Sequence, residues 1–344
     1  VKSDSSLLHD LSVVNRAFST FVFGALGAAG QRDDLMKHIL HAKKSATLIF
    51  ATIDRKLNIN NPGGKRLEDF QGQVEVRDVV YHYPMYPSMR ALDKLTVSIK
   101  PGQTVAVVGA KNSGKSTFLQ LLLRWFDPSS GTVEINGDNL QDFDVHWWRQ
   151  QVGYVPGQLE VFRGSVVDNI AYGDPRMEID MQDIIEAARE ADVHTAIMKE
   201  FPQGYSTTLD SKRDLLTEVQ RARLAIARAV FRKPKLLLVS NLTLGMDSTS
   251  EEMVQHTLKN VQRGRTCIIV YNRLSHTVDS DVIVLLSHGR VIEVGSYEQL
   301  MACKGAYSMM LSKERLGERR SQAIKGGAVV PSRRVTQVNT KPQI

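Results

Sequence analysis

The sequence predicts an α/β fold built around a parallel sheet that is buried on both faces. Three apolar segments lack the alternation of a half-exposed strand: Leu236 to Val239, Cys267 to Val270 and Val282 to Leu286. A fourth apolar segment, residues 103–108, is followed by a loop with two glycines and then by apolar residues at helical spacing. Unalternating strands with helices between them are typical of a parallel sheet, because both of its faces are covered.

The loop after residues 103–108 fills the G-x-x-x-x-G-K-S template of a phosphate-binding loop. It consists of Gly109, Ala110, Lys111, Asn112, Ser113, Gly114, Lys115 and Ser116. The two glycines allow backbone conformations that side chains obstruct, and the loop amides and the next helix N-terminus then face an anion. Lys115 reaches the outer phosphates of a nucleotide, and the Ser116 hydroxyl can ligate Mg²⁺.

Charge and composition exclude some classes of function. The 344 residues have a net charge of +7, but residues 313–344 alone hold eight Lys or Arg against two Glu. The rest is nearly neutral and has no basic stripe interleaved with aromatics, so a nucleic-acid partner is not expected. Residues 313–344 are predicted to be disordered, and both lipid contact and simple solvation remain open for them. Cys267 is expected to be a small core residue.

The N-terminal part is predicted to be separate from the main domain. Residues 11–30 are apolar and rich in small residues, with about the 20 residues that a membrane span needs, although Asn15 and Arg16 interrupt them. A buried soluble helix is the alternative. Residues 31–56 have the pattern of an amphipathic helix. A linker at residues 58–69 follows, and the compact domain is expected to start near Gly72.

Further elements of the domain follow from local patterns. Alternating residues predict strands at 73–81, 95–100 and 132–135. Residues 146–205 look mostly helical, and Leu215 to Val230 form a clear helix. Ser248 to Glu251 fits a capping box that opens a helix ending at Val261. A hairpin is predicted at Ser287 to Gly289.

Four longer strings make the sequence similar to a known family. They are YHYPMYPSMRALDKLTVSIKPGQTVAVVGAKNSGKST, FRGSVVDNIAYGD, QRARLAIARAV and NRLSHTVDSDVIVLLSHGRVIEVGSYEQL. Together they resemble the nucleotide-binding domain of an ABC transporter of the multidrug-resistance, P-glycoprotein type, over about residues 11–312.

The resemblance implies a full domain organisation. It implies a P-loop NTPase at residues 72–312, with a RecA-like core sheet, an antiparallel β subdomain and a helical subdomain at about 146–230. The end of a transmembrane segment is expected within residues 1–34, followed by the amphipathic helix and linker at 35–71. ATP and Mg²⁺ are the implied cofactors. The implied partners are a second nucleotide-binding domain and the transmembrane domains of an exporter, at a membrane with this domain on the cytoplasmic side.

The resemblance also assigns the binding half of the site. Tyr83 matches the aromatic residue that stacks on adenine, although a core tyrosine is the alternative. Gly109 to Thr117 match the phosphate loop. The glutamine that links the nucleotide to the membrane domains aligns with Gly157, and Gln158 follows one residue later.

The catalytic half departs from the family pattern. The family expects Asp-Glu after an apolar strand, where this sequence has Ser240 and Asn241. Ser240 brings no anionic charge to Mg²⁺, and Asn241 cannot accept a proton from water. Asn272 stands where a histidine should contact the γ-phosphate, and an amide carries no positive charge.

The signature segment of the family is altered as well. It should read Leu-Ser-Gly-Gly-Gln, and here it reads Leu216, Thr217, Glu218, Val219 and Gln220. Glu218 would bring a carboxylate towards phosphate oxygens, which repel it. Asp247 matches the carboxylate of the loop that crosses between paired domains, and a helix cap is its alternative role.

These residues predict a domain that binds ATP and hydrolyses it weakly or not at all, acting in an exporter through a partner. Two alternatives remain: a working ATPase that energises multidrug-type efflux, and a regulatory or scaffold protein with no transport role. Only the fold and the phosphate loop support the working ATPase, whereas the altered strand ends favour a domain with weak or lost hydrolysis.

Overall fold

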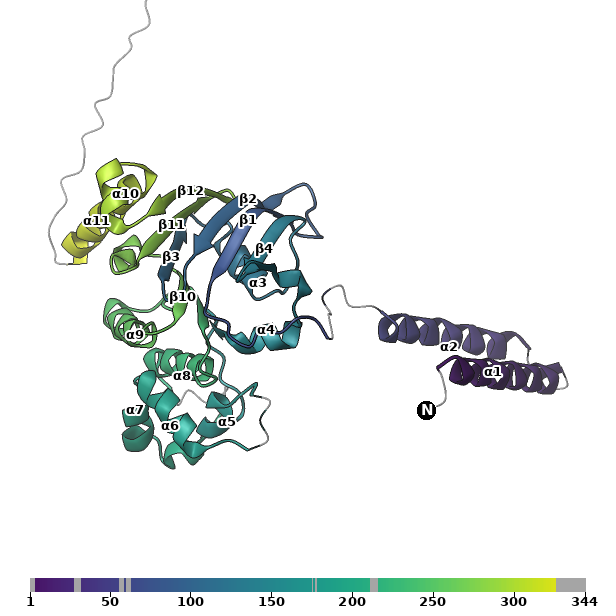
Figure 1. Cartoon of the computed structure of the whole chain (residues 1–344). Helices are drawn as coiled ribbons and strands as arrows, with labels where there is room; N and C mark the ends of the chain where they lie inside the picture. Colours follow the sequence, from purple (N-terminus) through teal and green to yellow (C-terminus); the bar gives the residue numbers. More distant parts are fainter. Residues whose placement is uncertain are drawn as a thin grey trace, which may run out of the picture. The chain divides into compact units, whose positions relative to one another are not determined.

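The computed structural model describes residues 4–27, 32–55, 59, 63–174, 176, 178–210 and 216–325. The chain divides into two compact units, one before residue 59 and one from residue 59 onward. The first unit holds α1 (Asp4–Gly27) and α2 (Arg32–Ile53), which cover most of the two helical segments expected there (Figure 1). In the described part of the chain, no helix is both long and apolar enough to cross a membrane. The end of a membrane segment within residues 1–34 therefore stays a prediction.

The core of the second unit is a six-stranded sheet with the order β12-β11-β3-β10-β9-β6. Five strands are parallel and β12 is antiparallel to β11, joined to it by the predicted hairpin. The strands are β3 (Thr104–Gly109), β6 (Val152–Val155), β9 (Leu236–Ser240), β10 (Thr266–Val270), β11 (Val282–Ser287) and β12 (Arg290–Gly295). The α/β fold with a buried parallel sheet is confirmed.

Successive residues of these strands pack on opposite faces of the sheet, which explains why their sequences do not alternate. In β9, Leu236 and Leu238 pack on one face, whereas Leu237 and Val239 pack on the other. Cys267 of β10 is fully buried as expected, and burial raises the pKa of its thiol to about 12.

One face of this sheet is covered by α3 (Lys115–Leu122) and by a second, four-stranded sheet. The second sheet is antiparallel, with the order β2-β1-β4-β5. It is the antiparallel β subdomain that the family resemblance implied, and its longer strands largely alternate between buried and more exposed residues. They are β1 (Val74–His82), β2 (Arg90–Ile99), β4 (Ser130–Ile135) and β5 (Asp138–Asn139).

The other face is covered by helices. Four of them gather at one end of the domain in Figure 1: α5 (Val166–Ile170), α6 (Met181–Glu190), α7 (His194–Glu200) and α8 (Glu218–Val230). Short pieces lie between them: β7 (Gly164–Ser165), η2 (Gly204–Ser206) and β8 (Thr208–Leu209). α9 (Ser248–Val261) packs beside α8 and has the predicted bounds.

The helical subdomain begins later than residue 146, where the sequence placed it. α4 (Val145–Gln151) belongs to the other face, because the fully buried Trp148 lies edge-on to Phe70 with 5.3 Å between ring centroids. The next segment, residues 152–155, is strand β6 of the main sheet. The helical subdomain therefore starts after β6.

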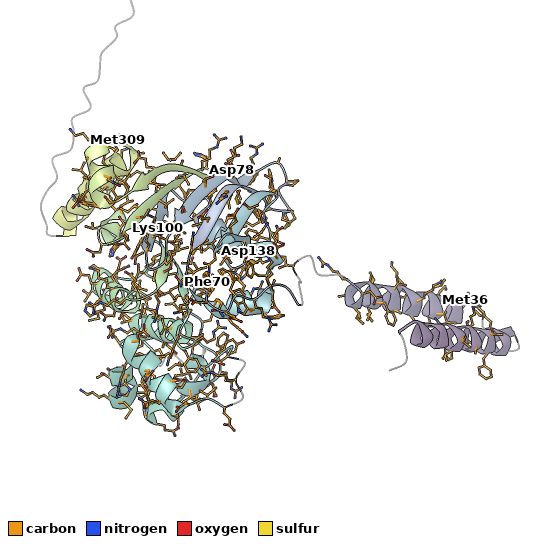
Figure 2. All side chains as sticks on the ribbon, in the orientation of Figure 1. Met36, Phe70, Asp78, Lys100, Asp138 and Met309 are labelled. Carbon is orange, nitrogen blue, oxygen red and sulfur yellow. The ribbon has the colours of Figure 1, made fainter. Side chains whose placement is uncertain are left out.

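The compact domain also starts earlier than Gly72. Lys65 forms a bridge with Phe143, next to η1 (Leu140–Asp142), and Arg66 pairs with Asp144 at 2.7 Å. Phe70, labelled in Figure 2, is only 3% exposed. The second half of the predicted linker is thus packed on the domain, a contact that the polar local sequence did not indicate.

The prediction of disorder from residue 313 onward was wrong for residues 313–325. After α10 (Tyr297–Cys303), helix α11 runs over Ala306–Lys325. Its start is anchored because Tyr307 and Leu311 are buried, and the Tyr307 hydroxyl lies 2.7 Å from Thr277 Oγ1. The Lys, Arg, Glu and Leu residues that follow favour helix although few of them are apolar. Residues 326–344 lie outside the described residues.

Candidate nucleotide site

The predicted phosphate loop and the predicted strand-end residues come together at one edge of the six-stranded sheet, whereas the signature segment and Asp247 lie at the starts of α8 and α9. Because β3, β6, β9 and β10 are parallel, their carboxyl ends meet at that edge, which is where ligands bind in open α/β sheets. β3 ends at Gly109 and β9 at Ser240. Asn272 follows β10 by two residues, and Gly157 follows β6 by two.

The backbone of the phosphate loop requires both of its glycines. A Cβ on Gly109 would lie 2.2 Å from the carbonyl oxygen of Leu286 on β11. Gly114 has a φ of +101°, and its Cβ would lie 2.8 Å from the carbonyl oxygen of Ala91. The loop is held from outside as well, since the Gly289 N–H donates to Ser113 O at 3.0 Å. The conformation of the loop is therefore set by its own glycines and is stabilised by the hairpin between β11 and β12.

Lys115 lies inside the curve of the loop. Its Nζ donates to the carbonyl oxygens of Gly109 and Ala110, both at 2.8 Å, and to Ser113 Oγ at 3.3 Å. The residue is only 8% exposed, and this burial lowers the pKa of its ammonium group. Neutral oxygens satisfy its hydrogen bonds but not its charge, so the loop presents a cation together with backbone amides.

The next two residues of the loop have different surroundings. Ser116 is exposed at the start of α3 and is free to ligate a metal ion. Thr117 is buried, and its Oγ1 lies 2.9 Å from the Tyr83 hydroxyl. Tyr83 also donates to Gln120 Oε1 at 3.2 Å, so its hydroxyl is anchored to α3.

The Tyr83 ring is half-buried. It lies edge-on to the rings of Tyr81 and Phe126, with centroids 5.2 and 6.0 Å away. The aromatic ring is thus fixed next to the phosphate loop and remains partly exposed. Its stacking on adenine stays a prediction.

The end of β9 has the expected position but no carboxylate. The Asn241 N–H donates to Val270 O at 3.3 Å, and its φ of 40° lies in the left-handed region. Asn241 Oδ1 is buried and has no hydrogen-bond partner among the residues that the structure describes. The side chain of Ser240 bonds to the phenol of Tyr154, whose pKa is raised by burial. Neither residue supplies a negative charge or a base.

The end of β10 and the loop after β6 lie next to this strand end. Asn272 is exposed, and the preceding Tyr271 N–H donates to Val107 O of β3 at 3.1 Å. A Cβ on Gly157 would lie 2.8 Å from Ser240 O, so the backbone there leaves no space for a glutamine side chain. Gln158, one residue later, is exposed in the same bend.

The altered signature segment forms a capping box at the start of α8, a role that was not predicted. Gln220 N donates to Thr217 Oγ1 at 3.2 Å, and Thr217 N donates to Gln220 Oε1 at 3.0 Å. Glu218 is the exposed first residue of the helix, where a negative charge is favourable. Leu216 and Val219 pack against the helical core. Two of the amides at this helix N-terminus are thereby engaged within the chain.

Asp247 is the N-cap of α9, and the predicted capping box from Ser248 to Glu251 was wrong. Asp247 Oδ1 accepts from the N–H groups of Thr249 and Ser250, both at 3.0 Å. A hydrogen bond from Ser250 is the main cause that holds the pKa of Asp247 below its usual value. Both residue types cap helices, so the sequence did not distinguish positions 247 and 248.

Because Glu251 is not part of the cap, it forms a buried cluster that was not predicted. It is 5% exposed, pairs with Arg273 at 3.1 Å and with His276 at 3.5 Å, and accepts from Thr243 Oγ1 at 2.9 Å. The cluster joins α9 to the loop that follows Asn272. Arg273 and His276 lie 22 or more residues from Glu251 in the sequence, and only Thr243 is nearer. No local pattern therefore indicated this cluster.

Comparisons with known proteins agree with this geometry. Residues 92–243 match the family model described as ABC transporter. The chain is 37% identical over 305 residues to ABC transporter B family member 2 of Dictyostelium discoideum. It is also 37% identical over 299 residues to human ATP-binding cassette sub-family B member 5. The folded domain is an ABC transporter nucleotide-binding domain.

The likeness of this ABC transporter domain extends to a solved structure. A bacterial Atm1-family ABC exporter with ATP bound matches 80% of this chain with a TM-score of 0.72 and 30% identity, and 47% of that chain is covered. The two relatives match 88% and 86% of this chain, which spans only 22% and 24% of their own length.

Proposed function

We propose that this domain binds ATP at its phosphate loop and couples binding to transport by a multidrug-type exporter, with hydrolysis weak or lost. The observation that carries the proposal is the contrast along one sheet edge. The loop at the end of β3 is complete around Lys115, whereas Ser240, Asn241 and Asn272 bring no ionised group to the neighbouring strand ends.

Nucleotide binding depends on the complete half. Lys115 and the amides of the loop hold the phosphates, and Tyr83 offers a fixed aromatic ring to the base. The exposed hydroxyl of Ser116 is the protein ligand available to Mg²⁺. Among the described residues, no group of three or more His, Cys, Asp or Glu could hold a metal ion. Mg²⁺ binding would thus depend largely on the phosphates themselves, and we expect its affinity to be low.

Hydrolysis depends on the altered half. A positioned base contributes about 10²- to 10⁴-fold to a rate, and a positioned charge or donor about 10²- to 10³-fold. Asn241 can orient water but cannot deprotonate it, and Asn272 cannot place a positive charge at the γ-phosphate. With these groups absent, turnover is expected near the background rate.

A second nucleotide-binding domain is the proposed partner, with the transmembrane domains of an exporter, at the cytoplasmic side of a membrane. In the paired arrangement of this family, the start of α8 faces the phosphate loop of the partner. Glu218 and the capping box would weaken that contact. Such a pair would have two nucleotide sites, each formed by the phosphate loop of one domain and the start of α8 of the other. Both sites would therefore be impaired, one by the altered strand ends of this domain and the other by its altered α8 start.

The test is equilibrium binding of Mg-ATP to the full chain by calorimetry. We expect saturable binding that Lys115→Ala removes and Lys100→Ala retains, since exposed Lys100 lies before β3 at the opposite end from Gly109. A wild-type chain that binds no ATP, or a Lys115→Ala variant that binds it equally, would overturn the proposal.

A further inference from the structure

The C-terminal helix α11 reaches the same edge of the sheet as the phosphate loop. The carboxylate of Glu314 accepts from the N–H of Leu274 at 3.0 Å and from the N–H of Ser275 at 3.4 Å. These amides open η3 (Leu274–Thr277), two residues after Asn272. Tyr307, earlier in α11, bonds to Thr277 at the end of η3. The helix is therefore fixed at two points to the loop that carries Asn272.

A cavity of about 210 Å³ lies between this helix and the phosphate loop. Gly109 at the start of the loop and Asn272 line one side of it, and Met310 and Lys313 of α11 line the other. Lys313 is exposed, and its flexible four-carbon stem ends in a compact positive charge. The carboxylate of Glu314 also borders the cavity, but it is engaged by the two amides of η3.

The charges around this cavity distinguish Lys313 from its neighbours. Arg273 forms an ion pair with the buried Glu251 at 3.1 Å. Lys115 is held by the carbonyl oxygens of the loop. Lys313 has no carboxylate within ion-pair distance in the part of the chain that the structure describes. It is thus a cation beside Asn272 whose charge is not already neutralised.

We propose that Lys313 binds the terminal phosphate of the nucleotide and supplies, from α11, the positive charge that Asn272 lacks. The inference rests on the proposed function, because it needs a nucleotide in the phosphate loop. A lysine is an effective point charge for phosphate, and the third phosphate of ATP brings extra negative charge to this side of the loop. Lys313 then favours ATP over ADP without providing a base for hydrolysis.

The experiment measures the ratio of the ADP and ATP dissociation constants for the full chain, with Mg²⁺ present. Lys313→Gln should weaken ATP binding about tenfold and change ADP binding less than about twofold. Lys313→Arg should retain the preference for ATP. Lys100→Gln, which removes the same charge at the opposite end of β3, should change neither constant.

A second variant tests the anchoring of the helix. Tyr307→Phe removes the hydrogen bond from α11 to Thr277 without changing a charge, and we expect it to lower the preference for ATP in the same direction as Lys313→Gln. If wild-type chain binds ATP but Lys313→Gln has an unchanged ratio of constants, this inference is overturned and the proposed function stands. If the wild-type chain binds neither nucleotide, both are overturned.

Discussion

The carboxyl end of β3 and the carboxyl ends of β9 and β10 share one edge of one sheet, but they differ in what they are made of. At β3 the loop is formed mostly by backbone groups around Lys115, held by the conformations of Gly109 and Gly114. At β9 and β10 the expected chemistry depends on side chains, and Ser240, Asn241 and Asn272 lack ionised groups. The difference shows that the geometry of the phosphate loop does not depend on ionised groups at the neighbouring strand ends.

The scaffold around the altered strand ends is nevertheless ordered. Asn241 is bonded to Val270, Tyr271 is bonded to Val107, and Gly157 packs closely on Ser240. The strand ends therefore stay in register with β3 without any carboxylate. This geometry indicates that binding at the phosphate loop and chemistry at the ends of β9 and β10 can be altered independently.

The largest expected effect is on the complete half. Lys115→Ala removes the cation at the centre of the loop, and we expect ATP affinity to fall by at least about 100-fold because a charge-assisted contact to phosphate is lost. The fold should remain, since the buried ammonium is itself costly to desolvate, as its lowered pKa indicates. Calorimetry and the thermal melt of the nucleotide-free chain measure the two results. A melt that collapses with Lys115→Ala would contradict the separation of binding from folding.

The next effect is on the altered half. Ser240→Asp, Asn241→Glu and Asn272→His together restore the expected ionised groups, and we expect ATP turnover to rise about 10²-fold or more. Adding Lys115→Ala to the triple variant should abolish the gain. Phosphate release in steady state measures it. Unchanged turnover with intact ATP binding would show that these three positions do not limit hydrolysis.

A smaller effect is expected at the start of α8. Thr217→Ala removes one half of the capping box, which should lower the free energy of unfolding by about 1 kcal/mol. ATP binding by the chain's own loop should not change. Ser248→Ala is a matched control, because the N-cap of α9 is Asp247. Equal destabilisation by both variants in urea denaturation would contradict the assigned caps.

The smallest effect concerns pH. The hydrogen bond from Arg66 and the N–H groups of Trp147 and His146 lower the pKa of Asp144 from 3.8 to about 2. This lowered pKa stabilises the fold above about pH 3.8, and the stabilisation is lost as pH falls through about 2. Asp144→Asn should therefore melt at a lower temperature than wild type at pH 7, with the difference vanishing near pH 2. If the difference in melting temperature does not depend on pH, the ionised carboxylate of Asp144 is not its cause.

Sequence patterns predicted the elements that depend on local chemistry. The strands of the main sheet follow from apolar runs, and the phosphate loop follows from Gly109, Gly114 and Lys115 at fixed spacing. Helix α9 was placed correctly, but its cap was not, because Asp247 and Ser248 are both good caps. Local signals thus gave the fold and the positions of most candidate site residues.

Contacts between distant segments could not be predicted. Because Phe70 is buried against Trp148, the domain starts earlier than the local sequence predicted. Glu251 contacts Arg273 and His276 only in the folded chain. The part of α11 after residue 312 has the average composition of a disordered tail. Its helix is anchored by Tyr307 and Leu311, which precede the segment, so composition alone gave the wrong result.

The most direct test of the account follows the fate of bound ATP. Full chain is mixed with Mg-ATP labelled on its γ-phosphate, freed of unbound nucleotide, and sampled over time for labelled ATP and labelled phosphate. We predict that the label remains in bound ATP, with phosphate formed no faster than in the Lys115→Ala control. Stoichiometric conversion of the bound ATP to ADP and phosphate, absent from that control, would contradict the claim that the domain binds ATP while its β9 and β10 strand ends do not support hydrolysis.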